Sequence, residues 1–77
     1  MTIDDVKLGS MVYGVNVVSP VISINNKRYR NYVVGKVVYI DTHGRWVTIQ
    51  TPNYKTCLWL SEAHPYTGRL PRIAVNY

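Results

Sequence analysis

Residues 32–51 read YVVGKVVYIDTHGRWVTIQT, and this stretch decides the fold. Both of its arms are rich in β-branched and aromatic residues, which is the composition that strands favour. The four residues between the arms, 41–44, read DTHG. Asp41 can open a turn by bonding the nearby backbone, and Gly44 can close it without steric cost. The stretch therefore predicts two antiparallel strands joined by a tight turn.

Side chains alternate between the two faces of a strand, and the first arm is apolar on both faces. One face of that arm carries Val34, Val38 and Ile40, and the other carries Val33, Val37 and Tyr39. In the second arm one face carries Arg45, Val47 and Ile49, with Arg45 at its start. The other face carries Trp46, Thr48 and Gln50. We predict a core lined by Val38, Val47, Ile49 and Leu58, with Tyr39, Trp46 and Trp59 outside. The outer face of the first arm then needs a cover, either the C-terminal residues or a partner.

The rest of the chain predicts short elements around this hairpin. At most one turn of helix is expected at residues 2–5. Residues 11–18 are expected to form an alternating strand, in which Gly14 suggests a bulge or a sharp bend. Residues 19–31 are expected to form a projecting hairpin, with Asn25 and Asn26 at its tip because Asn tolerates a positive φ. A strand at 54–60, one short turn at 61–64 and a last strand within 70–77 complete the prediction.

Five strands, a long first loop, short later turns and a one-turn helix before the last strand resemble the SH3-like small barrel. The pattern Gly35-x-Val37-x-x-Ile40 is similar to those of Tudor- and KOW-type barrels. The resemblance implies an all-β fold, a small five-stranded SH3-like barrel with at most one or two short helical turns. An OB-type barrel is the alternative, although it is normally longer. Barrels of the SH3-like kind commonly bind nucleic acid or short protein segments.

The size and composition indicate a small basic binding domain. With 77 residues, one domain covering residues 1–77 is expected, and 47% hydrophobic residues are enough for a core. Seven Tyr, two Trp and no Phe make the aromatic content amphipathic. The net charge of +5 favours nucleic acid or an acidic protein surface as the partner. The exposed strand edges of such a fold would also allow a homodimer.

Cys57 is the only cysteine, so no disulfide forms within the chain, which fits a reducing cytoplasm. No apolar run reaches the length of a membrane span, and the N-terminal residues lack a signal-peptide core. We therefore expect a cytoplasmic protein that does not bind membranes.

Catalytic and metal-binding motifs are not evident. The candidate metal ligands His43, Cys57, Glu62 and His64 lack the paired spacing of zinc sites. Cys57 fits a small buried thiol within a strand better than a nucleophile. The four acidic residues are too few for paired-carboxylate chemistry, and no glycine-rich phosphate loop occurs. We expect no enzyme activity, no metal and no cofactor.

The strongest local signal for binding is KRYRNY at residues 27–32, where cations alternate with aromatic side chains. Such a pattern suits phosphate contact combined with base stacking. The predicted nucleic-acid or partner-binding residues are Lys27, Arg28, Tyr29, Arg30, Tyr32, Lys36, Arg45, Trp46 and Trp59. No RNP-type or zinc-finger motif occurs, so readout of a specific sequence is not expected.

Two other interpretations of these residues stay open. The cations and tyrosines of residues 27–32 are also compatible with a solvated hairpin whose rings pack across its strands. Tyr, Trp and Arg are in addition the residue types enriched at protein interfaces, and outward Tyr39, Trp46 and Trp59 would form an exposed patch. In its small size and basic character the chain resembles accessory proteins of phages and mobile elements, some of which inhibit a host protein by occluding it.

Overall fold

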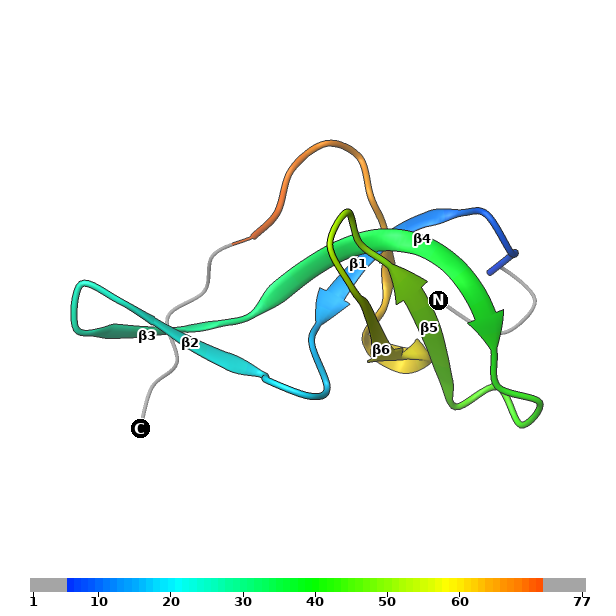
Figure 1. Ribbon diagram of the computed structural model, residues 1–77, viewed down its shortest axis with the longest axis horizontal. Coiled ribbons are helices and arrows are strands. Elements are labelled where there is room, and N and C mark those ends of the chain that lie inside the picture. Colours follow the sequence, from blue (N-terminus) through cyan, green and yellow to red (C-terminus); the bar gives the residue numbers. More distant parts are fainter. Residues whose placement is uncertain (1–5, 72–77) are drawn as a thin grey trace.

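The computed structural model describes residues 6–71, which form two antiparallel sheets and one short 3-10 turn (Figure 1). The larger sheet has the strand order β6 (Lys55–Trp59), β5 (Trp46–Gln50), β4 (Tyr32–Ile40), β1 (Met11–Val15) and β7 (His64–Pro65). The smaller sheet is the hairpin of β2 (Val21–Ile24) and β3 (Lys27–Arg30). The 3-10 turn η1 (Leu60–Glu62) leads from β6 into β7. The prediction of an all-β fold is confirmed.

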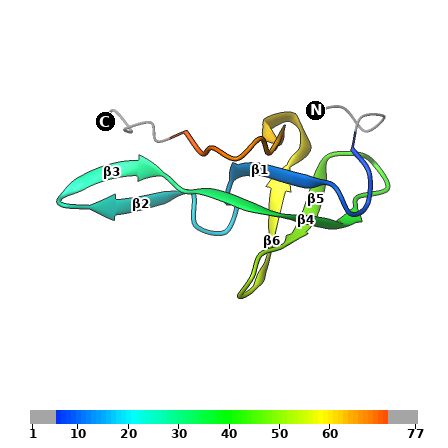
Figure 2. The same ribbon diagram turned by 90° about the horizontal axis from the view of Figure 1, so that it is seen from above.

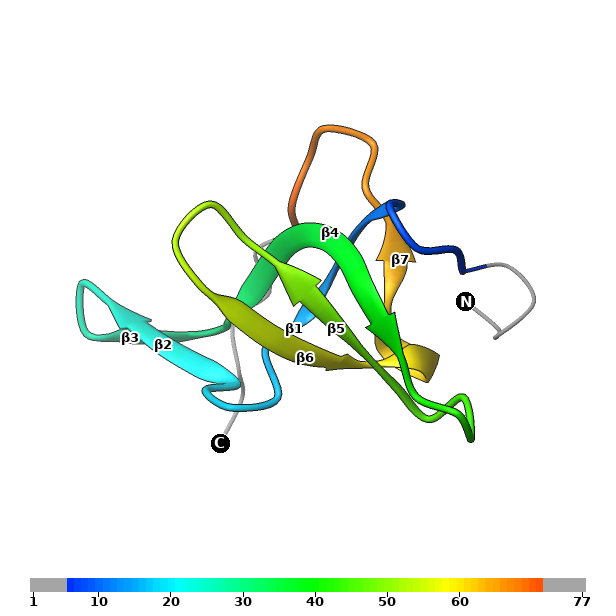
Figure 3. The same ribbon diagram turned by 45° about the vertical axis from the view of Figure 1, so that its right-hand side comes forward.

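The strand β4 is the long central element that the other parts of the fold share. It is strongly bent, with β5 and β6 on one side and β1 and β7 on the other (Figure 3). The β2–β3 hairpin projects beyond the start of β4, and the turn at residues 41–45 lies at the opposite end of the molecule (Figure 2). The predicted projecting hairpin is confirmed.

Both predicted turns form for the expected local reasons. The N–H of Gly44 donates to the Asp41 carbonyl at 2.8 Å, and the N–H of Arg45 donates to Asp41 Oδ2 at 3.3 Å. Gly44 has a φ of 68°, a value that glycine adopts without strain. At the hairpin tip, Asn25 and Asn26 have φ values of 53° and 66°, which are those of a two-residue hairpin turn.

The core is formed by side chains from both halves of the larger sheet together with Val6, Leu60 and Ala63 from outside its strands. Its buried apolar residues are Val6, Val12, Val33, Val37, Val47, Ile49, Leu58, Leu60 and Ala63. The predicted core positions Val47, Ile49 and Leu58 are fully buried. The prediction for Val38 is wrong, because its side chain is 40% exposed and Val37 is buried instead.

A β-bulge explains why Val38 lies outside. Val37 is opposite Ile49 and Tyr39 is opposite Thr48, so Val38 is the extra residue on β4. A bulge of this kind places two neighbouring residues against one on the partner strand and breaks the strict alternation of faces. Val37 therefore points inward, Val38 and Tyr39 are exposed, and Ile40 returns to pack against the core.

The first strand is shorter than predicted and has no bulge at Gly14. Its register with β4 is regular from Met11 to Val15. A Cβ on Gly14 would come within 3.1 Å of the Glu62 carbonyl oxygen and 3.2 Å of a Leu58 methyl carbon. Glycine at this position therefore allows close packing of β1 against β6 and η1.

The strand ends at Val15 because Asn16 redirects the chain. The N–H of Val18 donates to Asn16 Oδ1 at 3.0 Å, a local side-chain bond that competes with continued strand pairing. The same oxygen accepts the Thr56 hydroxyl at 2.6 Å, and both side chains are buried. Beside them, the Val17 N–H donates to the Cys57 carbonyl at 3.2 Å. These bonds bring the end of β1 against β6, although two strands, β4 and β5, lie between them in the sheet order.

Replacing Thr56 by Val is expected to destabilise the protein by about 1–2 kcal/mol. The change keeps the side-chain shape but removes one of the two donors to buried Asn16 Oδ1, and an under-satisfied buried acceptor is costly. Urea denaturation followed by tryptophan fluorescence measures the effect. Thr67→Val, at an exposed loop position, is the matched control and should change the free energy of unfolding by less than about 0.5 kcal/mol. Equal stability of the two variants would contradict the structural role of the Asn16–Thr56 bond.

The last part of the chain differs from the prediction in two respects. The strand predicted at residues 54–60 forms at Lys55–Trp59, and the short turn begins at Leu60 rather than Ser61. His64 and Pro65, predicted as the end of that turn and its stop, instead pair with Tyr13 and Val12 as β7. The fifth strand of the larger sheet is therefore β7. The predicted strand within residues 70–77 lies mostly outside the described residues, and so does the helical turn at 2–5.

Within residues 6–71, no helix has the length and apolar character needed to cross a membrane.

Candidate functional site

The strand register divides the basic hairpin into two faces. Arg28 and Arg30 are opposite Ser23 and Val21, and these four side chains share one face because strand faces alternate. Lys27 and Tyr29 share the other face with Ile24 and Ile22. The predicted cations and Tyr29 therefore do not form a single surface: two arginines lie on one side and the tyrosine lies on the other.

The face that carries Tyr29 is the more apolar of the two. A small pocket of about 70 Å³ on this side is lined by Ile22, Ile24, Tyr29, Arg30, Tyr32, Leu70 and Pro71. Tyr29 is half-buried there, whereas Arg28 and Arg30 are exposed. Tyr29 thus packs across the hairpin, as the solvated-hairpin interpretation expects, and the two arginines are accessible from outside.

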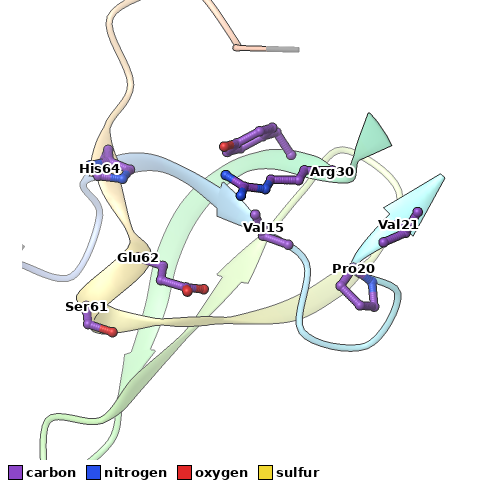
Figure 4. A pocket seen from close by; sticks show the side chains of 8 residues that line it. Val15, Pro20, Val21, Arg30, Ser61, Glu62 and His64 are labelled. Carbon is purple, nitrogen blue, oxygen red and sulfur yellow. The ribbon is translucent and has the colours of Figure 1, made fainter. Parts of the chain in front are cut away.

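A larger pocket of about 410 Å³ lies at the base of the hairpin, where it meets the five-stranded sheet (Figure 4). It is lined by Val15, Pro20, Val21, Arg30, Tyr32, Ser61, Glu62 and His64. Arg30 extends over the end of β1, and Glu62 points from η1 toward the same space (Figure 4). The pocket combines an apolar floor, one cation, one carboxylate and two rings.

A third ring, Tyr13, supports the two rings of this pocket. Its centroid is 6.0 Å from that of Tyr32, with an interplanar angle of 61°, and 5.3 Å from that of His64. The three side chains come from neighbouring strands, β4, β1 and β7, so cross-strand packing determines their positions. Tyr32 and His64 thus pack against a common neighbour, which defines this wall of the pocket.

The other predicted aromatic residues form a separate group at the far end of β4. The ring centroids of Tyr39 and Trp46 are 5.4 Å apart, and Trp46 is directly opposite Trp59. Trp59 is 47% exposed and Trp46 is half-buried. Arg45 immediately precedes β5, and its Nε lies 3.9 Å from Asp41 Oδ2, with the side chain largely in solvent. The predicted outward position of Tyr39 and Trp59 is confirmed.

Eight of the nine predicted binding residues therefore belong to two ends of the molecule, and the ninth, Lys36, does not. Tyr32 and Tyr39 are seven residues apart on β4, which corresponds to about 23 Å of strand at roughly 3.3 Å per residue. Lys36 lies between them beside an open apolar hollow of about 590 Å³. That hollow is lined by Met11, Val34, Gly35, Lys36, Val38, Gln50, Thr51 and Pro52. A ligand that reaches both ends must be extended.

The exposed charge of the described residues is almost entirely positive. Eight cations are exposed within residues 6–71: Lys7, Lys27, Arg28, Arg30, Lys36, Arg45, Lys55 and Arg69. The same part of the chain has two carboxylates, and Asp41 is buried in its turn, so Glu62 is the only exposed one. An anionic partner is therefore attracted to most of this surface.

The residues considered for metal binding or catalysis do not come together. Among residues 6–71, no three His, Cys, Asp or Glu side chains are grouped closely enough to hold a metal ion. Cys57 is half-buried, and its sulfur lies 3.7 Å from the Thr48 hydroxyl.

Sequence reasoning missed several lining residues of the pocket at the hairpin base. Ser61, Glu62 and His64 were expected in a turn, and Glu62 and His64 were considered only as metal ligands. Tyr13 was expected only as part of the alternating strand at residues 11–18 and was given no role. The alternation of residues 11–15 does place Tyr13 on one face with Val15, and this signal could have pointed to a shared outer surface. The pairing of β7 with β1, which brings His64 to Tyr13, had no sequence signal.

Comparisons with known proteins found no matching protein-family model, no matching curated protein and no matching solved structure.

Proposed function

We propose that this chain is an SH3-like small barrel that acts as a non-catalytic binding module for nucleic acid or a nucleoprotein complex. Three features support the fold assignment. Strands β1, β4, β5 and β6 are consecutive neighbours in the sheet, and a projecting hairpin separates the first two. A 3-10 turn precedes a short strand that returns to pair with β1. The hydrogen bonds that Asn16 accepts from Thr56 and that Val17 donates to Cys57 bring the two sides of the bent sheet together.

The charge of the surface is the observation that carries the functional proposal. Eight exposed cations against one exposed carboxylate within residues 6–71 favour binding to a phosphate backbone. Tyr32 and Trp59 lie at the two ends of this surface and offer rings on which bases stack. Single-stranded nucleic acid has both accessible phosphates and unpaired bases, so we propose it as the preferred form.

Titration with oligonucleotides tests the proposal directly. The protein is expected to bind a single-stranded 15-mer at low salt, with a change in the fluorescence of Trp46 and Trp59, and more weakly as salt is raised. A duplex of the same length is expected to bind less tightly because its bases are not available for stacking. If no oligonucleotide binds at 20 mM salt, the nucleic-acid proposal is wrong.

The alternative is a protein–protein interaction module, for instance a phage-type accessory factor that occludes a host protein. The apolar outer face of the sheet favours it, because Met11, Val38, Tyr39 and Trp59 are all exposed there. In soluble proteins such a patch usually marks an interaction site. Capture of partners from a lysate with and without nuclease separates the two functions. A protein partner that stays bound after nuclease treatment supports the alternative.

A further inference from the structure

We infer that the pocket at the hairpin base is a base-binding site that prefers guanine. This inference rests on the proposed binding of nucleic acid and adds a preference for one base at one position. The pocket of about 410 Å³ lies within the range of roughly 300–1,000 Å³ that is usual for small-ligand sites. Its charged side chains are Arg30 on β3 and Glu62 on η1.

The ring wall of the pocket suits a flat, uncharged group. Tyr32 lines the pocket and is half-buried, and Tyr13 contacts both Tyr32 and His64. Bases of single-stranded nucleic acid stack on such aromatic side chains. Val15 and Val21 add apolar lining from β1 and β2. A base that enters the pocket leaves water and contacts the ring of Tyr32, which packs against Tyr13.

Glu62 makes a phosphate an unsuitable occupant of the pocket and a guanine a suitable one. Its carboxylate accepts hydrogen bonds and donates none, so it repels an anion. Guanine presents two adjacent donors on its Watson–Crick edge, N1–H and the N2 amino group, which can both donate to one carboxylate. Adenine and cytosine present one donor beside an acceptor, and the single donor of thymine or uracil lies between two acceptors. Only guanine satisfies both carboxylate oxygens without a repulsive contact.

Arg30 gives the site its second contact. Within residues 6–71 neither Arg30 nor Glu62 has an ion-pair partner, so both side chains are available to a ligand. Arg30 comes from the hairpin, on the same hairpin face as Arg28, and its side chain extends over the end of β1 into the pocket (Figure 4). A phosphate next to the bound base would meet Arg30 while the base edge meets Glu62. Arg30 and Glu62 thus match the phosphate and the base edge of one nucleotide, respectively.

The test uses four labelled single-stranded 15-mers of thymidine in which only the central base differs, being dG, dA, dC or dT. One guanine per strand prevents guanine tetrads from forming within it. By fluorescence anisotropy, the wild-type protein is expected to bind the dG strand at least about fivefold more tightly than the other three, which is the lower end of what a two-bond base contact supplies. Glu62→Gln should abolish this preference, because the amide replaces one acceptor by a donor.

The control variant separates base recognition from charge. Thr42→Lys adds one positive charge in the exposed turn at the far end of β4, the same net change that Glu62→Gln makes. It should tighten binding to all four strands alike and keep the guanine preference. Equal affinities of the wild-type protein for the four strands, or an unchanged preference in Glu62→Gln, would overturn the guanine site alone. Absence of binding to every strand at low salt would overturn the site and the proposed function together.

Discussion

A variant carrying Arg28→Gln and Arg30→Gln is expected to bind single-stranded oligonucleotides at least about tenfold more weakly than the wild-type protein at low salt. Both arginines are exposed on one face of the projecting hairpin. The slope of log K against log salt should flatten by about one for each cation removed. Each lost cation removes one phosphate contact, so fewer counterions are released on binding. The loss should be similar for all sequences that lack guanine, since phosphate contacts carry no base information. Anisotropy titrations at four salt concentrations measure both quantities.

A second double variant shows whether position or net charge matters. Lys7→Gln with Lys55→Gln also removes two exposed cations, but from parts of the surface outside the hairpin. If the hairpin is the main contact, this variant should lose clearly less affinity than the Arg28 and Arg30 variant. Equal losses would show that the hairpin has no special role and that the whole basic surface acts as one. Both variants should unfold within about 0.5 kcal/mol of the wild type, as surface changes usually do.

Gly35→Ala is expected to be the most destabilising small substitution in the sheet, with a loss of at least about 2–3 kcal/mol. A Cβ at this position would lie 2.8 Å from the Gln50 carbonyl oxygen and 3.0 Å from Ile49 Cβ. One neighbour is a backbone atom of β5 and the other is a Cβ fixed to that backbone, so neither can move away without disturbing the β4–β5 ladder. A chain of this length has a total stability of roughly 4–12 kcal/mol, at about 0.05–0.15 kcal/mol per residue. Urea denaturation measures the loss as a shift of the midpoint.

Two other glycines serve as controls for this effect. Gly14→Ala brings a Cβ within 3.1 Å of the Glu62 carbonyl oxygen, a milder approach, and should destabilise the protein less than Gly35→Ala. Gly68→Ala meets nothing within 4 Å, and its φ of 101° leaves only a local backbone cost, of the order of 1 kcal/mol. If Gly35→Ala unfolds at the same urea concentration as Gly68→Ala, the close approach of β4 and β5 at Gly35 is not real.

Local sequence was sufficient for the features that depend on neighbouring residues. The turn at residues 41–44 follows from Asp41 and Gly44, and the hairpin tip follows from Asn25 and Asn26, because their backbone angles are set within a few residues. The alternation of the second arm placed Val47 and Ile49 in the core. The same period of two put Trp59 outside between Leu58 and Leu60. The excess of cations also required only composition.

The tertiary structure decided what depends on contacts between distant residues. Along residues 33–40 both faces are apolar, so the pattern did not state which one is buried, and the bulge at Val38 changed the alternation halfway. The bulge arises from the pairing of β4 with β5, and the sequence of β4 alone does not determine the register of that pairing. His64 meets Tyr13 only because β7 pairs with β1, and Arg30 and Glu62 line the same pocket only because the base of the hairpin meets the five-stranded sheet near η1. Alternation and turn chemistry are local properties of the chain, whereas a pocket lined by residues of β1, β2, β3, β4, η1 and β7 exists only in the folded tertiary structure.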